Sequence, residues 1–221
     1  IAINDAADAE YFYGPEQLIE NVLIDSPCST VSDFSYQVSG SPANNTIKSY
    51  GYFRRAGGTT FPFESGIVIT SGDAYPGGNV ITGGIVNNQN NLSGDADLDA
   101  YITSTPGTNS EDATYIKFTF TPIADNISFR YLMASEEYGD FECQYTDSFA
   151  FLLREVGTTT YTNLAVLPDG TEVTVTNINN NTTGCNSNPE YFAGYNPAIR
   201  DTNYGGRTVA LTAFASVTPN V

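Results

Sequence analysis

Apolar and polar residues alternate over several short stretches of this chain, which is the pattern of half-buried β-strands. The clearest alternation spans residues 114–121, where Ile116, Phe118 and Phe120 occupy every second position. Because successive side chains of a strand point to opposite faces, these three residues share one face of a sheet. We predict further strands at residues 34–38, 66–70, 127–133, 148–153, 173–176 and 208–214.

One segment near the N-terminus has helical spacing instead. Pro15 suits the first helical position, because its φ angle is already helical and its missing N–H has no partner there. Pro27 ends the predicted helix after Ser26, since proline cannot continue it. The apolar stripe of this helix, which we expect to pack on the core, consists of Leu18, Ile19, Val22 and Leu23.

Long loops rich in glycine, asparagine and proline separate the predicted strands. The longest span residues 71–94 and 177–201, and loops of this length are usually functional or tethered. No internal repeat or linker divides the chain, so we predict a single domain over residues 1–221. The fold class we predict is mainly β, an antiparallel β-sandwich or jelly-roll-like fold with one N-terminal helix and long loops.

The net charge and the absence of histidine exclude several classes of function. The chain has 25 acidic and 8 basic residues, a formal net charge of −17, and no histidine. A negative field of this size repels phosphate backbones, so no nucleic acid partner is expected. No apolar run could cross a bilayer, so no direct membrane insertion is expected. Without histidine, Ser-His-Asp catalysis, Cys-His catalysis and histidine-based zinc sites are excluded.

Three cysteines are present, and no two of them have the close spacing of a zinc site. Cys143 and Cys185 each lie in a polar loop, whereas Cys28 follows a proline at the end of the predicted helix. We therefore favour a disulfide between Cys143 and Cys185, which leaves the state of Cys28 open.

Residues 135–153 form an unusually acidic stretch between two apolar runs. Its carboxylates are Glu136, Glu137, Asp140, Glu142 and Asp147. Carboxylates this close repel one another unless a cation neutralises them. Because Glu136 and Glu137 are adjacent, both can reach one ion only from an irregular loop, which Gly139 would help to form.

A second acidic stretch places Asp95, Asp97 and Asp99 at alternate positions. Ala100 and Tyr101 follow, so the EF-hand pattern is not met, and a solvated acidic turn explains these residues about as well. Two acidic loops in one chain without histidine nevertheless favour calcium, which prefers oxygen ligands. We predict calcium as the cofactor, with ligands drawn from Asp73, Asp95, Asp97, Asp99, Glu136, Glu137 and Asp147.

Paired carboxylates could instead hydrolyse a glycosidic bond. The pairs open to this interpretation are Glu137 with Asp147, and Glu136 with Asp97. The chain has no tryptophan to form a sugar platform, although tyrosine can serve, and clustered carboxylates beside strands more often bind metal. We therefore expect a protein that is not an enzyme.

The order of motifs resembles the choice-of-anchor L domain of secreted surface proteins of Bacteroidota. The resemblance rests on residues 13–28, 34–38, 61–72, 94–98, 134–139, 145–151, 163–171 and 191–192. It implies export, through the type IX secretion route, to the outer cell surface or the extracellular space, and no established enzymatic activity. Family members normally continue with further strands after residues 208–217, so this chain is expected to lack the family's C-terminal strands.

The function we expect is a binding or adhesion module whose loops are ordered by calcium and whose ligand is a glycan or a protein at the cell surface. Two alternatives remain open at this point. One is a carboxylate-based polysaccharide hydrolase. The other is a structural subunit of a surface assembly, with a strand-donating or secretion-machinery partner, because an open sheet edge can accept a donated strand.

Overall fold

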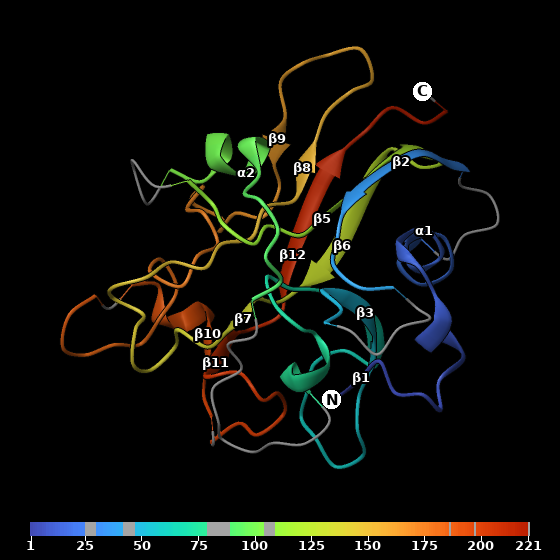
Figure 1. Cartoon of the computed structure of the whole chain (residues 1–221). Helices are drawn as coiled ribbons and strands as arrows, with labels where there is room; N and C mark the ends of the chain where they lie inside the picture. The colour runs from blue at the N-terminus through green and yellow to red at the C-terminus, as the bar shows by residue number, and fades with distance from the viewer. Residues whose placement is uncertain are drawn as a thin grey trace.

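Antiparallel strand pairing forms the framework of this protein (Figure 1). The structure is a computed structural model, and it describes residues 1–24, 30–41, 47–78, 89–103, 109–185, 187–196 and 198–220. The strands are β1 (Ala2–Ile3), β2 (Thr30–Gln37), β3 (Tyr50–Arg54), β4 (Ser65–Ile69), β5 (Tyr115–Thr121), β6 (Asn126–Tyr131), β7 (Ala134–Ser135), β8 (Leu152–Leu153), β9 (Thr162–Asn163), β10 (Phe192–Tyr195), β11 (Gly206–Thr208) and β12 (Leu211–Ser216). The helical segments are η1 (Ala9–Phe12), α1 (Pro15–Leu18), η2 (Ile19–Ile24), η3 (Tyr75–Gly77), α2 (Ala96–Tyr101) and η4 (Pro189–Tyr191).

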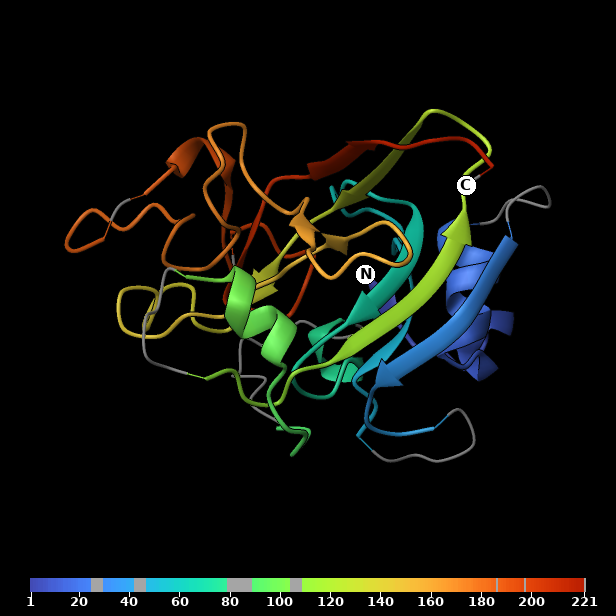
Figure 2. The same cartoon turned by 90° about the horizontal axis from the view of Figure 1, so that it is seen from above.

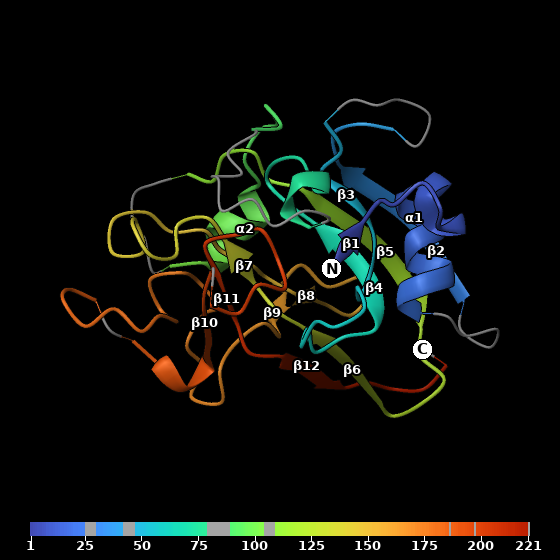
Figure 3. The same ribbon diagram turned by 90° about the horizontal axis from the view of Figure 1, so that it is seen from below.

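The strands pair into several small sheets. Their orders are β1–β3–β4, β10–β11–β7, β12–β6, β2–β5 and β8–β9. Figures 2 and 3 show the N-terminal helix against the curved β2–β5 ribbon, and the β6–β12 ribbon on the far side of β3 and β4. This sandwich-like arrangement confirms the predicted mainly β, antiparallel fold with a helix near the N-terminus.

The predicted N-terminal helix is present over residues 15–24, as α1 followed by the π-helical η2. Gly14 donates its backbone N–H to Gln17 Oε1 at 3.1 Å, which satisfies one of the free donors at the helix start. The apolar stripe buries Leu18 and Ile19, which are 1% and 2% exposed, as α1 packs on β3 and η2 packs on β4. Its predicted end at Pro27, together with Cys28, lies outside the described residues.

Four of the predicted strands are present close to their expected positions, as β2, β4, β5 and β6. The predicted strand at 208–214 is instead divided between β11 and β12, which belong to different sheets. β11 pairs with β7 and β10, whereas β12 pairs with β6 over its whole length. The residues of this segment are therefore divided between the β10–β11–β7 sheet and the β12–β6 sheet.

Two other strand predictions need correction. Of residues 148–153, only β8 is a regular strand, and residues 173–176 form none. A single bridge joins Ser148 to Thr174. The chain then turns, because Asn177 donates its N–H to Thr174 Oγ1 at 3.1 Å. Val173 and Val175 are both completely buried, so their apolar character reflects a buried turn rather than one face of a sheet.

β3 lies at the centre of its sheet, between β1 and β4, and was not among the predicted strands. Gly51 interrupts its apolar pattern, and the structure shows why a glycine stands there. A Cβ atom at this position would lie 1.9 Å from Asn4 Oδ1. The side chain of Asn4 occupies that space and donates to the Tyr50 carbonyl at 3.1 Å.

Two apolar clusters form the core. One lies beneath the β10–β11–β7 sheet, and its buried members are Met133, Tyr138, Leu167, Val173, Val175, Ile178 and Leu211. The other lies at the N-terminal sheet, and its buried members are Ile1, Ile3, Phe53, Phe61 and Ala74. Arg207 of β11 forms a buried ion pair with Asp201 at 2.6 Å, and its guanidinium lies 5.7 Å from the ring centroid of Phe61, a member of the second cluster.

Candidate functional site

The acidic loop, residues 136–147, begins where β7 ends and is closed by one serine. Ser135 pairs with Gly206 of β11, so its backbone is fixed by the sheet. Its hydroxyl donates to Asp147 Oδ2 at 2.6 Å and accepts from the Glu137 N–H at 2.9 Å. Ser135 therefore joins the two ends of the acidic loop and holds Glu137 and Asp147 beside each other.

Glu137 and Asp147 form a partly buried carboxylate pair. The N–H of Asp147 donates to Glu137 Oε2 at 2.8 Å. Burial, followed by the charge of Asp147, raises the pKa of Glu137 to about 7. Burial also raises the pKa of Asp147, although its hydrogen bond from Ser135 opposes the rise. In the part of the chain that the structure describes, no lysine or arginine forms an ion pair with either group.

Two more of the predicted ligands lie near this pair. Burial raises the pKa of Tyr204, a hydrogen bond with Thr70 opposes the rise, and the charges of Glu136, Asp147 and Asp73 add to it. Three carboxylates therefore act on one buried phenol. Even so, no three His, Cys, Asp or Glu side chains among the described residues form a group that could hold a metal ion in their present positions.

The buried hydroxyl of Tyr138 is a second feature of the region around these carboxylates. Tyr138 is 3% exposed, and its hydroxyl has no hydrogen-bond partner among the described residues. Burial raises the pKa of this phenol, and the charges of Glu142 and Asp147 raise it further. A buried hydroxyl without a hydrogen-bond partner is costly; a bound water would supply that partner, and a cation could instead be coordinated by the hydroxyl oxygen. The chemistry of these oxygen donors fits calcium.

The residues Asp95, Asp97 and Asp99 have a different structural role. They lie at the start of α2, whereas the sequence predicted them as calcium ligands, with a solvated acidic turn as an equally good explanation. Asp95 caps it by accepting from the Leu98 N–H at 2.8 Å, and Asp99 accepts from the Ser110 N–H at 2.7 Å. Asp97 faces Lys117 at 4.0 Å. Figure 1 shows α2 well apart from β7 and the acidic loop.

Glu142 was counted among the acidic residues of the loop but not among the predicted ligands. It is 2% exposed and fully supplied with donors. Its Oε1 accepts from Asn181 Nδ2 at 2.8 Å and from the Tyr195 hydroxyl at 2.9 Å, and its Oε2 accepts from the Gly139 N–H at 3.1 Å. No sequence signal distinguishes this structural carboxylate from its neighbours.

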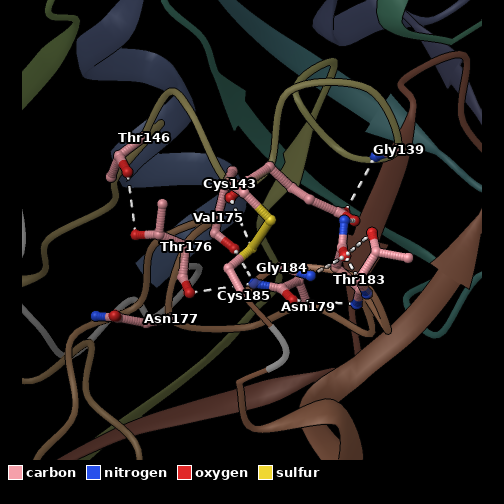
Figure 4. The surroundings of a disulfide bond; sticks show 12 residues. Gly139, Cys143, Thr146, Val175, Thr176, Asn177, Asn179, Thr183, Gly184 and Cys185 are labelled. Atoms are coloured by element: carbon pink, nitrogen blue, oxygen red, sulfur yellow. Dashed lines mark hydrogen bonds between the residues drawn. A yellow bond between two sulfur atoms is a disulfide. The ribbon is translucent and has the colours of Figure 1, made fainter.

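A disulfide joins the acidic loop to the segment 177–185 (Figure 4). It links Cys143 and Cys185, the pair favoured from the sequence, with their Cα atoms 5.5 Å apart. Cys185 also lies close to Glu142, because its sulfur is 3.5 Å from the Glu142 carbonyl oxygen. The disulfide therefore fixes the wall of the loop that carries Glu142.

Comparison with known proteins identifies one relationship. The family model described as Choice-of-anchor L domain matches residues 6–221. No curated protein and no solved structure matches the chain. Among the described residues, none of the helices has the length and apolar character needed to span a bilayer.

Proposed function

The chain belongs to the choice-of-anchor L domain family, and from this premise we propose that it is an extracellular binding or adhesion module of a bacterial surface protein, ordered by calcium. The family is one of surface-associated domains and is not an enzyme family. A disulfide suits an oxidising location outside the cytoplasm. Export by the type IX route in Bacteroidota is part of the same proposal.

The observation that carries the calcium proposal is the Glu137–Asp147 pair. Two ionised carboxylates, partly withdrawn from water and without a basic partner, destabilise the fold around them. A divalent cation would reverse this effect, because hard oxygen ligands are the ones that calcium prefers. Glu136 and Asp73 act on the same phenol as Asp147, and we include them as further candidate ligands. Asp73 Oδ1 also accepts from the backbone N–H groups of Lys48 and Tyr75 at 3.3 Å.

The residues at α2 are left out of this proposed site. Asp95 and Asp99 already accept backbone hydrogen bonds, so the capping role explains them without an ion. The net charge of −17 favours a ligand without negative charge, because the protein repels anions. A glycan or a surface protein fits this requirement, and a secretion-machinery or strand-donating partner remains a separate role for the same domain.

Calorimetric titration of calcium into chelator-treated protein tests the metal proposal. We expect binding of about one ion, strongly weakened in Asp147→Asn and Glu137→Gln. Asp97→Asn is the matched control, because it removes one carboxylate of the same kind from α2 and should leave binding unchanged. Equal binding by all four proteins, or loss only in the control, would contradict the proposed location.

Assays for released reducing sugars test the non-catalytic part. A panel of polysaccharides incubated with the calcium-loaded protein should show no turnover. Turnover that disappears in Glu137→Gln, with the fold intact, would show instead that the carboxylate pair is a hydrolase site.

A further inference from the structure

We propose that a polar pocket beside the disulfide binds one neutral sugar ring of a surface glycan, an inference that rests on the proposed function because it assigns a ligand class to the binding module. The pocket has a volume of about 280 Å³ and is open to solvent. Its walls come from the acidic loop, the segment 177–185 and β10. The lining residues are Gly139, Glu142, Asn180, Asn181, Thr182, Thr183 and Tyr195.

The floor of the pocket is held in place by Glu142. Its two carboxylate oxygens already accept from Asn181, Tyr195 and Gly139. Glu142 is therefore a positioning residue: it fixes the groups around it and has little capacity left for a ligand. One of these groups, Tyr195, places its ring in the wall, where an aromatic face can pack against the C–H face of a sugar.

The segment opposite the acidic loop is also rigid. Asn181 Oδ1 accepts from the Thr183 N–H at 2.8 Å, the Thr183 hydroxyl at 2.9 Å and the Gly184 N–H at 3.0 Å. The disulfide then ties this turn to the acidic loop through Cys185. A pocket whose walls are ordered before binding loses little conformational entropy when a ligand enters.

Two exposed polar side chains on this rigid rim have no role within the fold. The side chains of Asn180 and Thr182 are solvent-exposed, and neither makes a hydrogen bond with any described residue. The backbone N–H of Asn180 bonds instead to the Tyr195 hydroxyl. An amide and a hydroxyl offer both donors and acceptors, which is the combination that vicinal sugar hydroxyls require.

The volume of the pocket and the charge of the protein restrict the class of ligand further. Drug-sized ligands occupy pockets of about 300–1,000 Å³ that are mostly apolar, whereas this pocket is smaller and polar. An anionic sugar would meet Glu142 and a chain of net charge −17. A neutral ring, at the end of a glycan that continues into solvent, satisfies both limits.

The test is an NMR titration of the isotope-labelled, calcium-loaded chain. The probes are the methyl glycosides of glucose, galactose, mannose and N-acetylglucosamine. We expect at least one of them to shift the signals of Gly139, Asn181 and Thr182. The double variant Asn180→Ala/Thr182→Ala should weaken that binding by about tenfold or more, the loss of two hydrogen bonds.

A matched double variant, Thr159→Ala/Thr160→Ala, removes exposed hydroxyls from the loop between β8 and β9 and should bind as the wild type does. The pocket proposal is overturned if no probe shifts the pocket signals, or if Asn180→Ala/Thr182→Ala binds as tightly as the control. Calcium-dependent stability measured on the same samples separates the two ideas: if it persists, only the pocket is wrong, and if it is missing, the proposed calcium-ordered module fails by itself.

Discussion

The carboxylates of the acidic loop have different structural roles although they lie close together in the sequence. Glu136, Glu137 and Glu142 have the same chemistry within seven positions of one another. Glu137 lies beside Asp147 without a basic partner, whereas Glu142 is surrounded by donors. A carboxylate supplied with donors is stable as an anion, and one beside a second carboxylate favours a proton or a cation. Local geometry therefore divides these residues into structural and candidate metal-binding groups.

The raised pKa of Glu137 gives a pH dependence with a definite sign. A folded-state pKa of about 7, above the ordinary value of 4.5, means that the folded protein holds a proton that the unfolded chain releases. In chelator, the free energy of unfolding should therefore fall as pH rises from about 4.5 to about 7. Since the side chain is only partly buried, we expect a loss on the order of 1 kcal/mol.

Urea unfolding at a series of pH values, in chelator, checks this. Glu137→Gln removes the titrating group and should flatten the profile over that range. A wild-type profile that rises with pH, or a variant profile as steep as the wild type, would contradict the account of this pair.

Glu142 leads to a second prediction at this scale. Glu142→Ala leaves the Tyr195 hydroxyl, the Asn181 amide and the Gly139 N–H without their acceptor. Although these donors are half-buried or exposed, Glu142 itself is buried and holds all three, so the free energy of unfolding should fall by about 2–4 kcal/mol. Asp140→Ala, an exposed neighbour in the same loop, should change it by less than about 0.5 kcal/mol. Chemical denaturation measures both, and equal effects would refute the buried role of Glu142.

At the scale of elements, periodicity predicted those strands that have one buried and one exposed face. β6 follows this rule, since exposed and half-buried residues alternate along it, whereas β5 was predicted from its alternating residue types although only Lys117 is exposed in it. The prediction failed where a segment is buried on both sides, as at 173–176, or where a glycine replaces a packed side chain, as at Gly51 in β3. The pairing of Glu137 with Asp147 depends on the hydroxyl of Ser135, and no spacing rule contains that contact.

The helix α2 is the clearest case of a local motif with a structural explanation. Three aspartates that resemble part of a calcium loop lie at the start of a helix. Asp95 accepts from a free N–H there, and the negative charges interact favourably with the positive end of the helix dipole. Neither alternation nor charge density separates these two interpretations, because both require clustered carboxylates. The contacts of Asp95 and Asp99 with Ser110 support the capping interpretation.

Substitutions in α2 test this interpretation. Asp95→Ala removes the cap and should lower the free energy of unfolding by about 0.5–2 kcal/mol, whereas Asp95→Asn keeps an oxygen acceptor and should lose much less. The difference should be the same in calcium and in chelator, as measured by chemical denaturation. A loss that appears only in calcium would place an ion at α2 and contradict the capping role.

Over the whole molecule, the candidate sites lie at the acidic loop and at the segment 177–185 that the disulfide joins to it. Arg207 of β11 contacts Asp201 and Phe61, and β11 also pairs with β7, the strand that leads into the acidic loop. The disulfide fixes the same loop at Cys143, between Glu137 and Asp147. The loop is thus held at Ser135 by the sheet and at Cys143 by the disulfide. The carboxylate pair is the part whose stability depends on what neutralises it.

Thermal unfolding in calcium and in excess chelator, with metal content measured on the purified protein, tests the central claim most directly. An ion that binds only the folded state stabilises it by mass action. We therefore predict a midpoint that rises with calcium concentration in the wild type and stays constant in Asp147→Asn. A protein without bound metal, whose midpoint is the same in calcium and in chelator, would contradict a calcium-ordered module.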